Sequence, residues 1–129
     1  MPRYAIVLSY DDGLVERAAE IWRSAGATYS PLDGAHVHLQ GSKGQTFLMY
    51  EWSLTTEDRD DLAPDSTGEG VAIPDLARVR AFIAECRDAR WFTELVACLA
   101  AASRQSRWVL DSGDRLWHAG AIDPEGLRL

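Results

Sequence analysis

The sequence predicts an α+β domain with a mainly antiparallel sheet, and three observations lead to that fold class. Short stretches are apolar throughout or alternate polar with apolar residues, as strands do, and two pairs of them flank turn sequences, as in hairpins. Other stretches repeat apolar residues at helical spacing. Their order along the chain is strand, helix, hairpin, loop, two helices and hairpin. This order favours one antiparallel sheet with the helices packed on one face.

Length and composition limit the classes of protein that this chain can belong to. Its 129 residues predict a single domain, 1–129, long enough to bury a core, and 47% hydrophobic residues are typical of a globular protein. No apolar run approaches the ~20 residues of a membrane span, and residues 1–5 lack a signal-peptide pattern, so we expect a cytoplasmic protein and no membrane partner. A net charge of −7 argues against nucleic acid as a partner.

The chain begins with a predicted strand and helix. Residues 4–10 are nearly all apolar, as in a strand covered on both sides, and Asp11-Asp12 follows where the next helix starts. The apolar stripe of that helix is Leu14, Val15, Ala18, Ile21, Trp22 and Ala25. Gly26 is a natural helix end, and residues 29–34 are expected to form a loop.

Two closely spaced histidines lie in a predicted β-hairpin. Residues 36–40 alternate polar and apolar, residues 41–44 are turn-forming, and residues 46–52 are rich in strand-favouring types. Pairing Gln40 with Gln45 places these side chains on one core face: Val37, Leu39, Leu48, Tyr50 and Trp52. The other face then carries His36, His38, Gln40, Phe47, Met49 and Glu51. Being half polar and half apolar, this second face suits contact with another molecule.

Most of the negative charge is concentrated in residues 55–70, where no periodicity is visible. Six acidic residues stand against Arg59 alone, a net charge of −5: Glu57, Asp58, Asp60, Asp61, Asp65 and Glu69. A long loop of this kind is usually functional or mobile.

Two helices are expected in the second half, followed by a second hairpin. An apolar stripe at Leu76, Val79, Phe82, Ile83 and Cys86 predicts a helix that begins near Pro74. A second stripe, Trp91, Phe92, Leu95, Val96 and Leu99, is out of phase with it, which predicts a break within residues 86–90. Residues 108–110 and 115–119 flank the turn 111–114, as in a hairpin. We expect both cysteines, Cys86 and Cys98, to act as small core residues.

Few residues form a pattern that carries chemistry. His36 and His38 share one face of a strand, but no further ligands complete a zinc site, so no metal or cofactor is predicted. Asp11 and Asp12 are explained by helix capping, with a carboxylate pair for acid–base work as the alternative. No serine or cysteine has a nucleophile motif, so no catalytic residue is assigned.

The remaining signals favour a protein-binding surface over an active site. The predicted contact residues are Glu57, Asp58, Asp60, Asp61, Asp65, His36, His38, Phe47, Met49 and Glu51. An acidic surface associates quickly with a basic partner because complementary charge raises the association rate. The alternative is a small enzyme or ligand-binding domain whose single pocket uses Asp11, Asp12, His36 and His38.

The C-terminal sequence WVLDSGDRLWHAGAIDPEGLRL, residues 108–129, resembles the end of small actinobacterial proteins of the polymorphic-toxin immunity type. The similar features are a hydrophobic strand, a DSGD turn, a second strand and a closing DPEGLRL. This resemblance covers about the last sixth of the chain and transfers no functional residue. It implies a non-enzymatic immunity protein that binds and blocks a toxin domain in the cytoplasm, and it leaves the oligomeric state open.

Overall fold

The computed structural model describes residues 3–31 and 34–129, and it confirms the α+β fold class. The elements in chain order are β1 (Tyr4–Ser9), α1 (Leu14–Ile21), the 3₁₀ turn η1 (Arg23–Ala25), β2 (Thr28–Ser30), β3 (His36–Gln40), β4 (Thr46–Trp52), α2 (Thr56–Asp60), β5 (Ser66–Thr67), β6 (Arg80–Cys86), α3 (Ala89–Ala101), β7 (Trp108–Leu110) and β8 (Arg115–His118). Positions 1–2 and 32–33, which belong to the expected N-terminal pattern and the expected loop 29–34, lie outside the described residues.

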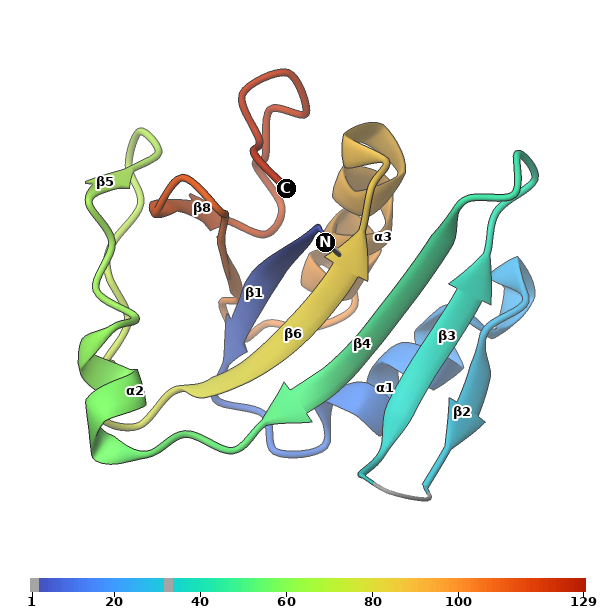
Figure 1. Cartoon of the computed structure of the whole chain (residues 1–129), viewed down its shortest axis with the longest axis horizontal. Coiled ribbons are helices and arrows are strands. Elements are labelled where there is room, and N and C mark those ends of the chain that lie inside the picture. The colour runs from blue at the N-terminus through green and yellow to red at the C-terminus, as the bar shows by residue number, and fades with distance from the viewer. Residues whose placement is uncertain (1–2, 32–33) are drawn as a thin grey trace.

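The strands of the described residues form an eight-stranded sheet in the order β2-β3-β4-β6-β1-β7-β8-β5. Every neighbouring pair is antiparallel except β5–β8. Helices α1 and α3 lie behind the sheet in Figure 1, on one face, as expected. The segment that contains α2 and β5 stands on the opposite side, which we call the front face (Figure 1).

The main core lies between the sheet and helices α1 and α3. Leu14, Val15 and Ala18 of α1 and Phe92, Leu95, Val96 and Leu99 of α3 are buried there, as their stripes predicted. Phe47 stands at its centre, with its ring centroid 5.0 Å from that of Trp22 and 5.8 Å from that of Phe92. Cys86 belongs to this core, whereas Cys98 is exposed, so the expectation of two core cysteines is wrong for Cys98.

The β3–β4 register differs from the expected one by a single residue. Gln40 pairs with Thr46 instead of Gln45, because Gln45 belongs to the turn, where its carbonyl accepts from Gly41 at 2.7 Å. Gly44 supplies the positive φ of 80° that this turn requires. A one-residue shift turns every side chain of a strand to the other face. Phe47 and Met49 therefore join Val37 and Leu39 in the core, while Leu48, Tyr50 and Trp52 lie on the front face.

The expected helix near residues 74–86 is also wrong, because residues 80–86 form the strand β6. Its apolar residues fit a two-residue period as well as a helical one, since Phe82, Ala84 and Cys86 alternate toward the core. Residues 80–86 adopt the strand because they form hydrogen-bonded pairs with β1 on one side and β4 on the other. The expected break between two helices within residues 86–90 is therefore a change from strand to helix: β6 ends at Cys86, and the side chain of Asp88 caps α3 by accepting from the Trp91 amide at 3.1 Å.

Candidate functional site

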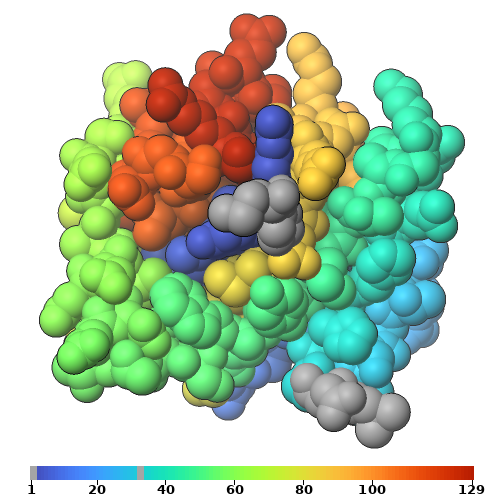
Figure 2. Space-filling view, in the orientation of Figure 1, coloured from blue at the N-terminus to red at the C-terminus, as the bar shows by residue number. Residues whose placement is uncertain are grey.

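The front face of the sheet has a covered half and an open half. We call residues 54–79, which carry α2 and β5, the acidic segment; it packs on the covered half through Leu62 and Val79, which are fully buried against Leu8, Ala81, Trp108, Leu110 and Leu116. Among the described residues, β3, most of β4 and the adjoining part of β6 lie outside this cluster, and Trp52 of β4 and Ile6 of β1 pack against its edge. Figure 2 shows the acidic segment as a wall at the left, with β1 and β6 between it and β3.

The acidic segment is folded and anchored, which corrects the expectation of an unstructured loop. Thr55 and Asp58 form a capping box at the start of α2. Arg59 reaches inward and donates from one guanidinium nitrogen to the carbonyl oxygens of Leu76 at 3.0 Å and Val79 at 2.7 Å. Trp108 donates from Nε1 to the Ala72 carbonyl at 3.1 Å. These contacts therefore fix the position of the acidic segment relative to the sheet.

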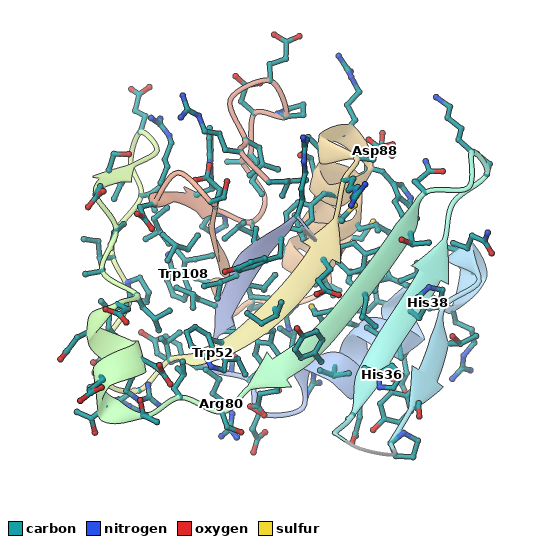
Figure 3. The ribbon with its side chains drawn as sticks, in the orientation of Figure 1. His36, His38, Trp52, Arg80, Asp88 and Trp108 are labelled. Carbon is teal, nitrogen blue, oxygen red and sulfur yellow. The ribbon has the colours of Figure 1, made fainter. Side chains whose placement is uncertain are left out.

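The strand pairings arrange the front-face side chains in three rows across the sheet. The covered row is Trp52, Ala81, Leu8 and Trp108; the middle row is His36, Tyr50, Ile83 and Ile6; and the outer row is His38, Leu48, Glu85 and Tyr4. Trp52 and Trp108 stand toward the acidic segment, and His36 and His38 stand on β3 at the far side (Figure 3). All four middle-row side chains are half-buried, and Tyr4 is 45% exposed.

A hollow of 480 Å³ is lined by His36 and Tyr50 of the middle row and by the start of α1, and we call it the α1 hollow. The start of α1 contributes Asp12 and Glu16, and the strands contribute His36, Tyr50 and Glu51. The Glu51 carboxylate already pairs with Arg80, with Nε and Oε2 2.9 Å apart. That hydrogen bond, with the negative charges of Glu51 and Asp12, raises the pKa of Arg80 although burial lowers it.

A second hollow, of 270 Å³, lies at the other end of the middle row, and we call it the β1 hollow. Tyr4 and Ile6 of β1 and Leu110 of β7 line it, together with the exposed carboxylates of Asp61 and Asp114 and the cation Arg3. Asp61 belongs to the acidic segment, so this hollow joins the acidic segment to the open half. Acidic side chains therefore stand at both ends of an apolar row.

The predicted acidic contacts lie mostly at the surface. Glu57, Asp60, Asp61 and Asp65 are exposed, while Asp58 is half-buried and its side chain is used in the capping box. His36 and His38 lie on the open half, as expected of contact residues. Phe47 and Met49 are fully buried, so their assignment to a contact surface is wrong, for the register reason given above.

The four residues of the alternative pocket are not brought together. The α1 hollow contains Asp12 and His36, but Asp11 does not line it, and His38 lines a separate hollow with Arg3, Leu48 and Glu85. Within the described residues, no group of three His, Cys, Asp or Glu side chains is placed to hold a metal ion.

Asp11 has a structural role in place of the expected helix cap. Its Oδ1 accepts from the Gly13 amide at 2.9 Å, and its Oδ2 lies 2.6 Å from Arg17 and 3.4 Å from the buried Arg107. Burial alone would raise the pKa of Asp11, but the Gly13 hydrogen bond and the two cations lower it below its usual value. The residue at the N-cap position itself is Gly13, which has no side-chain cap.

Sequence reasoning missed Tyr4, Ile6, Ile83 and Glu85 as members of the open half. Two of them, Glu85 and Tyr4, interact electrostatically with Tyr50. Burial, the charge of Glu85 and the neighbouring Tyr4 raise the pKa of the Tyr50 phenol. The missing information was the pairing of β6 with β1 and β4, which joins residues 29 to 81 positions apart. No local pattern in the sequence carries that pairing.

Comparisons with known proteins give this chain no relative: no protein family, curated protein or solved structure matches it. Among the described residues, no helix has both the length and the apolar character needed to cross a membrane.

Proposed function

We propose that this chain is a binding protein without catalytic activity, of the immunity type, that blocks a basic toxin domain. The observation that carries the proposal is the acidic segment, which is anchored against the sheet while Glu57, Asp60, Asp61, Asp65 and Glu69 face solvent. The carboxylates are therefore held on a fixed wall beside an uncovered apolar surface. A basic domain that docks there gains complementary charge and buries apolar area at once.

Fixed charges support this function better than a flexible tail would. A tail must be ordered when it binds, and this costs free energy. The Arg59 hydrogen bonds and the buried Leu62 have already ordered this segment in the unbound chain. Clustering five exposed carboxylates also repels anions, so the surface selects basic partners over acidic ones.

The test is the association rate with basic protein domains encoded by genes that neighbour this one. We expect wild type to bind one of them and the rate to fall as salt is raised, because the ~8 Å screening length at physiological salt shortens. In the triple variant Glu57→Lys, Asp60→Lys, Asp61→Lys we expect the association rate to fall by about tenfold or more. Stopped-flow or surface plasmon resonance measures it.

A matched control separates local charge from total charge. The triple variant Glu20→Lys, Glu94→Lys, Glu125→Lys changes the net charge equally, but its sites are exposed positions outside the acidic segment. We expect it to keep most of the wild-type rate. Equal losses in the two triple variants, or an unchanged rate in the first with an intact fold by circular dichroism, would contradict a role for the acidic segment. Failure of every such domain to bind wild type would reject the proposed function.

A further inference from the structure

The middle row is a strip that crosses four neighbouring strands, and its side chains are apolar or aromatic except for His36; beyond Ile6 it meets the buried Leu110 of β7. His36 pairs with Tyr50, Tyr50 with Ile83, and Ile83 with Ile6. Neighbouring strands lie about 4.8 Å apart, so three spacings give a strip of about 14 Å from β3 to β1. Tyr50 and Ile83 are half-buried and belong to neither core cluster, while Ile6 is half-buried and packs partly against the cluster that contains Leu62. Apolar side chains left in this state on a regular sheet face are typical of an interaction surface.

The two ends of this strip carry a charge of the same sign. In the α1 hollow, Arg80 pairs with Glu51, which leaves Asp12 and Glu16 as the additional carboxylates. In the β1 hollow, Asp61 and Asp114 face one cation, Arg3. Each end is therefore net negative, while the strip between them is apolar.

We propose that the basic partner lies along the middle row and places one arginine or lysine in each hollow, with aliphatic side chains between them. This inference rests on the proposed function, because it assigns the contact surface of the same partner. Charge complementarity selects the occupant. A second copy bound symmetrically through this face would bring two acidic ends against each other, and a nucleic acid would bring phosphates against them.

The length of the strip defines the segment that fits it. An extended chain advances about 3.4 Å per residue, so a span of about 14 Å corresponds to four residues. The occupant is therefore an extended segment of the partner with two cationic residues four positions apart. The strip is fixed in a continuous sheet, so the site is present before binding.

A short peptide tests this surface before any natural partner is identified. The probe is a five-residue peptide with arginine at both ends and aliphatic residues between, added to the full chain labelled with ¹⁵N; the matched peptide has glutamate at both ends. We expect the arginine peptide alone to shift the amide signals of Tyr50, Ile83 and Ile6, and added salt to weaken the shifts. Equal shifts with the glutamate peptide, or shifts confined to other residues, would overturn the inference.

Paired variants locate the contacts. We expect Asp12→Asn with Asp61→Asn to weaken peptide binding about three- to tenfold, and the control pair Glu20→Gln with Glu94→Gln to leave it unchanged. Ile83→Thr removes apolar contact at the centre and is expected to weaken binding about fourfold. Its control, Ile73→Thr, changes an isoleucine that is 54% exposed on the acidic segment. Equal effects of variant and control would reject the middle row as the contact.

The outcomes separate this inference from the proposed function. If a basic domain binds wild type and Ile83→Thr equally well, the proposed function stands, but the middle row is not its contact surface. If no basic domain binds, the proposed function fails, and the peptide shifts alone decide whether the row binds cationic segments. Self-association in sedimentation that Ile83→Thr abolishes would assign the row to a second copy and overturn the inference.

Discussion

The two halves of the front face share strands β4, β6 and β1 but differ in how deeply their side chains are buried. In the covered row, Leu8 and Ala81 are fully buried, and Trp108 is 8% exposed. One step along the same strands, Ile6, Ile83 and Tyr50 of the middle row are half-buried. The residue types are similarly apolar, so hydrophobicity alone does not separate core from surface here. The acidic segment does, because Leu62 and Val79 bury Leu8 and Ala81, whereas Ile6 packs only partly against the same cluster and Ile83 and Tyr50 do not belong to it.

This difference shows how a segment can serve two purposes. Its inward side, with Leu62, Val79 and Arg59, completes a second small core. Its outward side presents carboxylates beside the open half. Stability and charge placement are thus coupled: a change that detaches the segment also moves the acidic wall.

The largest loss of stability is expected from Leu62→Ala, which removes the main apolar anchor of the acidic segment from the covered half. Because Leu62 is 1% exposed, we expect a loss of about 2–5 kcal/mol in the free energy of unfolding. Urea unfolding measures the loss. The control is Leu48→Ala on the open half, where a half-buried side chain is expected to cost less than about 1.5 kcal/mol. Equal losses would mean that the two halves are not energetically different.

A smaller effect is expected from Arg59→Met, which keeps the length of the side chain but removes both hydrogen bonds to the Leu76 and Val79 carbonyls. We expect about 1–3 kcal/mol less stability, since those carbonyls lose a charged donor. Hydrogen exchange is expected to become faster in residues 71–79. Arg78→Met, at an exposed arginine of the same segment, serves as the control and is expected to change little. Unchanged exchange in Arg59→Met would show that Leu62 alone holds the wall.

The smallest predicted effect concerns the acid–base behaviour of the open half. Burial and the negative charge of Glu85 disfavour the Tyr50 phenolate, so its pKa is raised. We expect Glu85→Gln to lower the pKa of Tyr50 toward its ordinary value, as measured by ultraviolet difference titration. Removing a distant exposed charge with Glu94→Gln is expected to leave that pKa in place. If both variants behave alike, the charge of Glu85 does not act on the Tyr50 phenol.

The sequence by itself determined the elements whose apolar spacing is local. These are the stripes of α1 and α3, the end of the first helical region at Gly26, the start of a new element after Cys86 and the hairpin around residues 111–114. All of them follow from neighbours within a few positions. It also located the acidic surface, because charge density can be counted along the chain. It did not determine that this surface is folded.

Only the tertiary structure decided the register, the identity of β6 and the division of the front face. The sequence assigned Phe47 and Tyr50 to the wrong faces because Gln45 belongs to the turn and not to the strand. The packing of Phe47 against Trp22 and Phe92 in the core favours the observed register. Residues 80–86 satisfy both a helical and a strand period, and their pairing with β1 selects the strand. These decisions depend on contacts between residues far apart in the chain. A periodicity reports which side chains share a face, but only packing determines what that face meets.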